Sequence, residues 1–408
     1  MNILFLTNFF TSPQEAGSIR AWQIVHYLNE KGHRITVIAS GADFITGEAK
    51  RKGLNNIKDN NLKIYYIQPI FKNFRKTKIH RILHELISAI YQLYISITLK
   101  DEFSLVYSSI PSIFTSIIGY LISKIKKTKY VVEQRDLVAY GLKEMEIVSC
   151  PIIIKFVEYL EVFCWHKADL IVAISEGIKR TIKKKGINER KIKVIPNGVE
   201  NFLLKWCEQN SDKLEQLKTQ LNTNDKFIVL FCGTLSYVTD IFTLLKTAAL
   251  LKAYNDIIFL IIGDGQRKKE YIEFCKQNNL TNCIFLNSKP REEIFYFCKI
   301  ASVGIHLLKK GAFWECFLSN KIFDYLGSGL PVIFAGSGET AKLIEESKGG
   351  IIVEPEDPEK LKDAILLLFT RKEEMKEMSK NGKEYVVNHY SRKKFLMELE
   401  QYLYKLYE

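Results

Sequence analysis

The chain has 408 residues, of which 47% are hydrophobic and 26% are charged, so we expect more than one domain and exclude the collagen-like and disordered classes. Its formal net charge of +13 indicates an anionic partner, such as nucleic acid, an acidic membrane surface or a phosphorylated substrate. The eight cysteines are scattered and form no CxxC pair or zinc-like cluster, which favours reduced thiols in a cytosolic protein.

Short apolar runs alternate with helical patterns along the chain, which predicts parallel sheets covered by helices on both faces. In the first half the expected strands are Ile3–Thr7, Ile35–Ala39, Lys63–Ile67, Leu105–Ser108, Tyr130–Glu133, Leu170–Ile174 and Lys193–Ile195. In the second half they are Ile228–Cys232, Ile257–Ile262, Cys283–Leu286, Val303–His306, Pro331–Phe334 and Ile351–Val353. The sequence begins with a strand-like run and no basic leader, so no signal peptide is expected.

Each half of the chain starts with a strand that leads through a glycine, Gly17 or Gly233, into a helix. This echo predicts two doubly wound α/β domains rather than one large sheet. The break between them should lie near 199–226, where Pro196–Gly198 is a turn signal. We expect domains at 1–200 and 201–385, and a C-terminal helix at 386–408 that packs back on the first domain.

The segment 71–100 combines a basic start with apolar residues at helical spacing. The pattern fits an amphipathic helix that lies on a membrane surface. A core-facing helix with a solvated basic end is the alternative. The further basic clusters Lys124–Lys129 and Lys179–Lys193 favour the membrane. The longest apolar stretch, Leu86–Leu99, is too short to span a bilayer.

Two segments of the first half carry candidate site residues. The loop after the first strand ends with Gly17 and Arg20 at a helix start, where backbone N–H groups can approach an anion. It is not a G-x-G-x-x-G fingerprint, so a nicotinamide cofactor is not favoured. After the fifth strand comes Glu133–Leu137, in which Asp136 is a candidate base for an acceptor hydroxyl and Arg135 a candidate ligand of a phosphate. A mutual ion pair of these two residues is the alternative.

The second half carries three glycine-containing loops, each directly after a strand: Gly233-Thr234, Gly263-Asp264-Gly265 and Gly336–Thr340. They should meet at one edge of a parallel sheet. Ser319-Asn320-Lys321 opens a helix there, so Lys321 can neutralise a diphosphate and Asp324, on the same helix face, can bind a ribose diol. A simple surface pair of Lys321 with Asp324 is the alternative. The expected ligand contacts are Gly233, Thr234, Gly263, Gly265, Ser319, Asn320, Asp324, Gly338, Glu339 and Thr340.

No metal or other cofactor is expected. The sequence contains no D-x-D, HExxH, P-loop or Ser-His-Asp elbow. His80 and His84 alone have a ligand-like spacing, and we expect them at an interface or on the surface. Charge neutralisation is therefore expected from Lys321 and from helix N-termini.

An ordered series of short motifs resembles a known family. The motifs are GHRITV at 32–37, EQRDL at 133–137, ADLIVAIS at 168–175, VIPNGV at 194–199, GDG at 263–265 and the SNK…DYL…GLPV series from Ser319 to Val332. Together they look like a retaining glycosyltransferase of family four, in the fucosaminyltransferase-like subset that acts on capsule, O-antigen or exopolysaccharide precursors.

The resemblance implies a GT-B fold, in which two doubly wound Rossmann-like domains face each other across a cleft. It implies that a hexosyl or N-acetylhexosaminyl group passes from a nucleotide sugar, with UDP the expected carrier, to a lipid-diphosphate-linked glycan. Gly17 and Arg20 would line the acceptor side, and Arg135 and Asp136 would lie near the reacting centre. Lys321 would stabilise the leaving group. The protein would be cytoplasmic and bound to the inner membrane surface through segment 71–100.

The chain departs from the family pattern at two places. The family has paired carboxylates eight residues apart; Asp324 matches the second, but Cys316 replaces the first, with Glu315 beside it. Thr234 and Thr239 stand where an arginine and a lysine are frequent in the family. The diphosphate contact therefore depends on Lys321 and backbone amides.

Two other functions stay open at the level of sequence. A nucleotide-sugar epimerase of the same fold would need acid and base groups around the sugar and no lipid acceptor. A nucleic-acid-binding protein would need basic patches with stacking aromatic residues along a groove. The basic clusters of this chain lie beside an amphipathic apolar stripe instead, so no nucleic-acid partner is expected.

Overall fold

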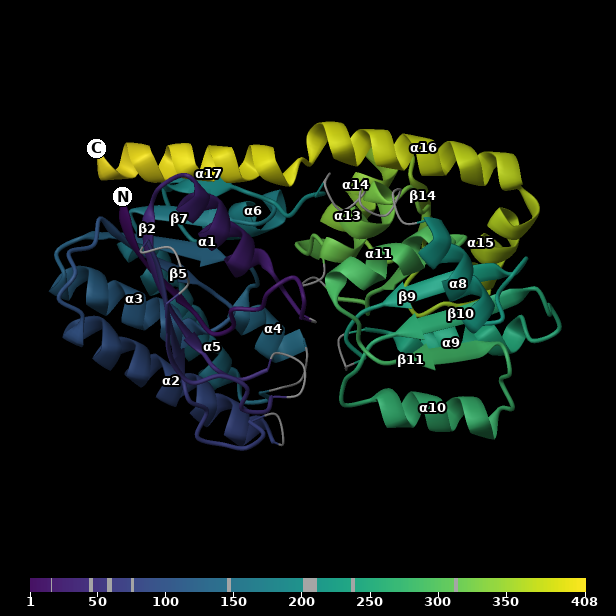
Figure 1. Ribbon diagram of the computed structural model, residues 1–408, viewed down its shortest axis with the longest axis horizontal. Helices are drawn as coiled ribbons and strands as arrows, with labels where there is room; N and C mark the ends of the chain where they lie inside the picture. Colours follow the sequence, from purple (N-terminus) through teal and green to yellow (C-terminus); the bar gives the residue numbers. More distant parts are fainter. Residues whose placement is uncertain are drawn as a thin grey trace. The chain divides into compact units, whose positions relative to one another are not determined.

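The computed structural model describes residues 1–15, 17–43, 47–56, 61–74, 77–144, 148–200, 211–235, 239–311 and 315–408. The chain forms two compact units (Figure 1). Unit 1 contains residues 1–12, 17–196 and 395–408, and unit 2 contains 13–16 and 197–394. The sequence placed the break after residue 200 and the start of the C-terminal segment at 386.

Unit 1 is built on an eight-stranded sheet of order β3-β4-β2-β1-β5-β6-β7-β8. Its strands are β1 Asn2–Thr7, β2 Arg34–Ser40, β3 Gly53–Asn56, β4 Leu62–Ile67, β5 Leu105–Ser109, β6 Lys129–Gln134, β7 Leu170–Ala173 and β8 Ile192–Val194. The seven strands expected from the sequence are present and parallel, but β3 was missed and pairs antiparallel with β4. Its sequence, GLNN, has no β-branched or aromatic residue to indicate a strand.

Helices cover both faces of this sheet. They are α1 Arg20–Glu30, α2 Lys78–Thr98, α3 Ile113–Ile125, α4 Val138–Glu144, α5 Pro151–Lys167 and α6 Glu176–Lys184, with a 3₁₀ turn at Glu189–Lys191. Alternate residues of β1 separate the two cores. Ile3 and Phe5 pack with α1 and with the C-terminal helix α17, Arg392–Tyr407, whereas Leu4 and Leu6 pack with α2 and α3.

Unit 2 is built on a six-stranded parallel sheet of order β11-β10-β9-β12-β13-β14. Its strands are β9 Phe227–Cys232, β10 Ile257–Ile262, β11 Cys283–Leu286, β12 Val303–Leu307, β13 Val332–Ala335 and β14 Gly350–Val353. Its helices are α8 Ser211–Gln220, α9 Ile241–Leu250, α10 Lys268–Gln277, α11 Arg291–Ile300, α13 Asn320–Gly327, α14 Glu339–Ser347, α15 Pro358–Thr370 and α16 Lys372–His389. Because the strands are parallel, the loops that follow β9, β10 and β13 leave the sheet at one edge.

The sequence analysis gave a core-facing helix as the alternative for segment 71–100, which contains α2. Ile79, Ile90 and Ile97 of its apolar stripe are exposed, so most of the stripe does not face the core, although Leu93 packs against it. The expectation that His84 lies at the surface is wrong. Its ring is buried against Phe74, with centroids 4.3 Å apart, and shares a hydrogen bond of 3.1 Å with Ser40 Oγ.

Candidate functional site

The side chain of Lys321 lies across the end of β9 in unit 2. A Cβ on Gly233 would stand only 2.2 Å from Lys321 Cε and 2.8 Å from its Nζ, so the lysine occupies the space that a side chain at 233 would take. Burial lowers the pKa of Lys321, while Cys232 and Asp324 act in the opposite direction. The part of the chain that the structure describes gives this ammonium no ion pair, only the ring of Phe231, whose centroid is 5.9 Å away. The cation can therefore receive an anionic ligand.

The glycines around Lys321 let main-chain segments touch one another. A Cβ on Gly263 would lie 1.9 Å from the carbonyl oxygen of Gly233, and one on Gly338 would lie 2.2 Å from the carbonyl oxygen of Glu315. Gly338 also has a positive φ of 80°, which favours glycine. The loops after β9 and β10 thus meet each other, whereas the loop after β13 meets the segment before α13, and main chain packs on main chain at both places.

Asp324 does not pair with Lys321, so the surface-pair alternative is wrong. Its Oδ1 instead accepts a hydrogen bond of 2.5 Å from a terminal nitrogen of Arg291, the first residue of α11. The other terminal nitrogen of Arg291 bonds Glu200 Oε1 at 2.9 Å. Burial raises the pKa of Asp324, and Arg291 opposes that rise.

Arg291 was missed by the sequence analysis. One signal could have indicated it: a cation in the first turn of a helix is unfavourable with the helix dipole unless a carboxylate holds it there. Its Nε is buried and has no hydrogen-bond partner among the described residues. The arginine clamps Asp324 through Oδ1, and the second oxygen of this carboxylate forms no hydrogen bond within the part of the chain that the structure describes.

Several of the residues predicted to contact the ligand use their side chains to hydrogen-bond the main chain of the loops instead. Ser319 Oγ caps α13 by accepting from the backbone N–H of Lys321 at 3.3 Å. The buried hydroxyl of Thr340 donates to the carbonyl of Phe317 at 2.7 Å. Thr239 donates to the carbonyl of Thr234 at 3.3 Å. Three further predicted contacts are half-buried: Thr234 follows Gly233, Asn320 is the first residue of α13 and Glu339 is the first residue of α14. The last one, Gly265, packs on the main chain of Leu235.

Asp264, between two of the predicted glycines, organises the next loop of this edge. Its Oδ1 pairs with Lys268 Nζ at 2.7 Å, and its Oδ2 accepts from the backbone N–H and the hydroxyl of Ser288 at 2.6 and 2.7 Å. Burial alone would raise the pKa of Asp264, but these donors outweigh it and lower the pKa. The carboxylate is thus a structural tie between the ends of β10 and β11.

In unit 1, Arg20 is buried and bound to Glu133. Its Nε lies 2.8 Å from Glu133 Oε1, and its terminal nitrogens donate to the carbonyls of Pro196 and Ile195 at 3.1 and 2.7 Å. Burial would raise the pKa of Glu133, but Arg20, Arg135 and other donors outweigh it and keep the pKa low. With 3% of its surface exposed, Arg20 is placed to position this cluster rather than to contact a ligand directly.

Arg135 and Asp136 lie at the surface end of the same cluster. A terminal nitrogen of Arg135 donates to Ser18 Oγ at 2.5 Å, which joins the exposed Gly17 loop to the end of β6. The structure has no ion pair between Arg135 and Asp136 in the described residues, contrary to the ion-pair alternative. Burial raises the pKa of Asp136 while Arg135 opposes the rise. Asp136 is consequently a carboxylate with increased basicity.

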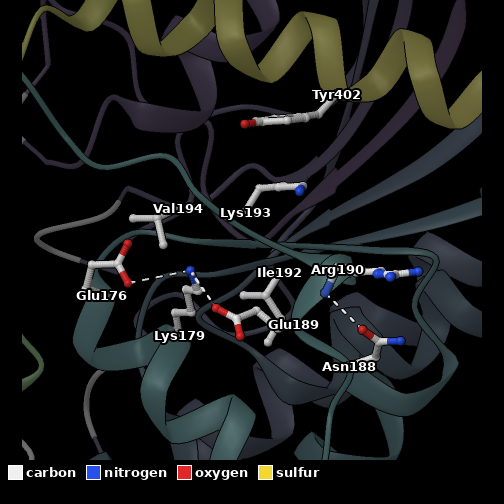
Figure 2. A pocket seen from close by; sticks show the side chains of 9 residues that line it. All are labelled: Glu176, Lys179, Asn188, Glu189, Arg190, Ile192, Lys193, Val194 and Tyr402. Carbon is white, nitrogen blue, oxygen red and sulfur yellow. Dashed lines mark hydrogen bonds and ion pairs between the residues drawn. The ribbon is translucent and has the colours of Figure 1, made fainter.

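A separate groove in unit 1 contains none of the predicted residues. It lies between α6, the 3₁₀ turn, β8 and α17 (Figure 2). Lys179 stands there between Glu176 and Glu189, at 3.8 and 3.2 Å. The ammonium of Lys193 lies over the ring of Tyr402, 5.1 Å from its centroid. The charges are largely compensated within the groove, so it is not a second candidate site.

Two family models divide the chain between them. Residues 17–201 match the model described as Glycosyltransferase Family 4, and residues 212–385 match that of Glycosyl transferases group 1. An uncharacterized glycosyltransferase of Methanocaldococcus jannaschii is 21% identical over 86% of this chain and 86% of its own. These matches support a group 1 glycosyltransferase.

Solved structures confirm the expected fold. Sucrose-phosphate synthase from Thermosynechococcus elongatus superposes with a TM-score of 0.77 at 15% identity, covering 100% of this chain and 99% of that one. Anabaena HepE in complex with UDP-glucose gives a TM-score of 0.74 at 16% identity, covering 99% and 100%. Both α/β units thus have the GT-B fold, and the two family models support a glycosyltransferase activity for the protein.

Proposed function

We propose that the protein transfers a sugar from a nucleotide diphosphate sugar to a glycan acceptor, with retention of the anomeric configuration. The observation that carries the donor assignment is Lys321, a half-buried cation that forms no ion pair with any residue that the structure describes, set among glycine loops and the N-termini of α13 and α14. A diphosphate leaving group gains negative charge as the glycosidic bond breaks. A fixed cation and helix N-termini stabilise that charge more in the transition state than in the ground state.

Asp324 completes the donor assignment. Arg291 fixes one of its oxygens, and a ribose diol can donate to the other. We assign UDP as the carrier because a protein of the same fold, HepE, is described in complex with UDP-glucose. The transferred group would be a hexose or an N-acetylhexosamine. Because Lys321 and the helix N-termini supply positive charge, we propose transfer without a metal ion, with unchanged rates in EDTA as the check.

The acceptor side is assigned to unit 1. Asp136, whose pKa burial raises, would accept the proton of the acceptor hydroxyl, and Arg135 would bind an acceptor phosphate. Arg20 would keep Glu133 and its neighbours in place, with the Gly17 loop beside them. The acceptor we propose is a lipid-diphosphate-linked glycan, a precursor of a capsule, O-antigen or exopolysaccharide.

A lipid-linked acceptor needs an enzyme at the membrane surface. The exposed apolar residues of α2, within segment 71–100, support such a location. We therefore place the protein in the cytoplasm, peripherally bound to the cytoplasmic membrane. Nucleic acid is not part of this proposal, and salt-sensitive DNA or RNA binding without nucleotide-sugar affinity would contradict it.

A thermal-shift panel of nucleotide sugars tests the donor assignment. Wild type should be stabilised by UDP-sugars, and Lys321→Met and Asp324→Asn should lose most of that shift. Asp256→Asn, whose carboxylate forms a surface pair with Lys226, is the matched control and should keep it. Unchanged protection in Lys321→Met would refute the diphosphate assignment. Isomerised UDP-sugar without transfer would instead identify an epimerase.

A further inference from the structure

The helix α2 has its polarity reversed relative to an ordinary surface helix. Its buried side chains are His84, Ser88, Gln92 and Ser96, together with Ala89. The four polar residues follow one another at intervals of four and therefore form one stripe against the sheet. A helix that faces water normally buries apolar residues and exposes polar ones. The outer surface of α2 is therefore not adapted to water.

Three side chains of the polar inner stripe form hydrogen bonds within unit 1, although the buried Oε1 of Gln92 has no hydrogen-bond partner among the described residues. Gln92 Nε2 donates to the carbonyl of Thr7 at 3.0 Å, and Ser96 Oγ donates to the carbonyl of Gln92 at 2.6 Å. His84 shares its hydrogen bond with Ser40, and burial lowers its pKa to about 4, so the ring is neutral. These contacts fix which side of α2 faces inward: Leu93 and Ile95 are partly buried against the core, whereas the larger part of the apolar stripe, including Ile79, Ile90 and Ile97, is left outside.

The neighbouring helices extend the apolar surface. In the structure α3 packs against both α2 and α5 (Figure 1). Seven large apolar side chains on these helices are each more than half exposed, namely Ile79 (68%), Ile90 (55%), Tyr94 (65%), Ile125 (54%), Ile152 (78%), Phe156 (59%) and Tyr159 (65%). We call the outer surface of α2, α3 and α5 the three-helix face. Apolar surface gathered in this way on one side of a domain indicates an interaction site.

The charge of the three-helix face selects its partner. The acidic residues of these helices are all engaged: Glu85 pairs with Arg81 at 3.2 Å, Glu158 pairs with Lys185, and Glu161 accepts backbone N–H groups of α4. Exposed lysines, Lys124 and Lys155 among them, lie at the same helices. A cationic apolar face is complementary to an anionic lipid surface, whereas a second copy of itself would bring like charges together.

We propose that the three-helix face docks on an anionic lipid bilayer, with the start of α5 and the outer side of α2 inserted among the headgroups. The insertion is interfacial, since no helix among the described residues is long and apolar enough to cross a bilayer. This inference deepens the proposed function, because it names the surface and the lipid charge through which the transferase reaches a lipid-linked acceptor.

Vesicle co-sedimentation tests the three-helix face directly. Wild type should bind vesicles of phosphatidylglycerol mixed with phosphatidylcholine, and bind pure phosphatidylcholine at least tenfold more weakly. The double variants Ile90→Glu/Tyr94→Glu and Ile152→Glu/Phe156→Glu should each lose binding at least tenfold. The control Met397→Glu/Tyr407→Glu introduces the same charges at exposed apolar positions of α17 and should bind within twofold of wild type. Lys124→Gln/Lys155→Gln should weaken binding about fivefold per lysine at low salt.

The outcomes separate this inference from the donor assignment. UDP-sugar thermal shifts measure unit 2 and should be the same in wild type and in the face variants, and urea unfolding followed by circular dichroism shows that unit 1 of these variants is folded. Vesicle binding without UDP-sugar protection would support the face and overturn the proposed function. Equal vesicle binding by all variants would refute the proposal that the three-helix face docks on the bilayer. So would a wild-type dimer that the face substitutions turn into a monomer, because the occupant would then be a second copy.

Discussion

Lys321 reaches the end of β9 because residue 233 is glycine: a Cβ there would lie 2.2 Å from Lys321 Cε. Contacts below about 3 Å force one of the two groups to move. The position of the added Cβ is fixed by the main chain, so the flexible side chain of Lys321 must move. We expect Gly233→Ala to displace the ammonium from the diphosphate. A lost charge-assisted hydrogen bond weakens binding by about tenfold or more, which calorimetric titration with UDP measures.

The control for this substitution is Gly186→Ala. Gly186 also has a positive φ, of 82°, but an added Cβ meets nothing within 4 Å. It should lower stability somewhat while leaving UDP affinity unchanged. Equal UDP affinity in Gly233→Ala and wild type would show that Lys321 does not contact the nucleotide.

Removing Arg291 should destabilise unit 2. Arg291→Met leaves Asp324 and Glu200 without their shared cation in a largely buried setting, and breaking a buried ion pair in this way costs about 3 kcal/mol or more. Lys289→Met, which breaks the exposed pair with Glu293, should cost about 0.5 kcal/mol or less. Urea unfolding followed by circular dichroism compares the two, and similar losses would refute the clamp.

Asp136→Asn should remove most transfer without affecting the donor. Loss of a positioned general base lowers kcat by about 100-fold or more, whereas the UDP-sugar thermal shift should be retained. Activity of wild type should fall as acid protonates Asp136, at a pH above the ordinary aspartate range because burial raises the pKa of this carboxyl. Arg135 holds that pKa down, so Arg135→Gln should move the acidic limb to higher pH. A limb that stays in place would contradict the assignment.

His84 should make the stability of unit 1 depend on pH. Its pKa is lowered from 6.5 to about 4 by burial, so the unfolded chain binds a proton at a higher pH than the folded one. The stabilisation from the neutral ring is complete above pH 6.5 and is lost as the pH falls toward 4. Between pH 7 and pH 5 wild type should lose about 2 kcal/mol that His84→Phe keeps. Equal losses in urea unfolding would show that His84 does not titrate in this way.

Most of the fold follows from local sequence signals. Apolar strands bounded by glycine loops fixed the order of elements in both units, because a buried parallel strand needs a continuous apolar run. The strand β3 escaped detection since GLNN carries no such signal. Its place in the sheet depends on pairing with β4 rather than on its own composition.

The site was partly predictable for the same reason. Glycine loops after strands and a lysine at a helix start are local patterns, and they indicated Lys321. The pair of Arg291 with Asp324 joins residues 33 positions apart and depends on which helix starts lie beside each other. The sequence also could not predict which face of α2 packs against the sheet, because apolar residues at helical spacing show which residues share a face but not where that face points.

The reversed polarity of α2 has a practical consequence for work with the purified protein. Protein engineering for higher solubility commonly replaces exposed apolar residues by charged ones. In this protein it would select Ile79, Ile90 and Tyr94 for substitution. Such a variant would behave better in buffer and still bind UDP-sugar. If the three-helix face docks as proposed, the variant would no longer reach a substrate held in a lipid bilayer, and its transfer activity would be lost although the protein is easier to handle in solution.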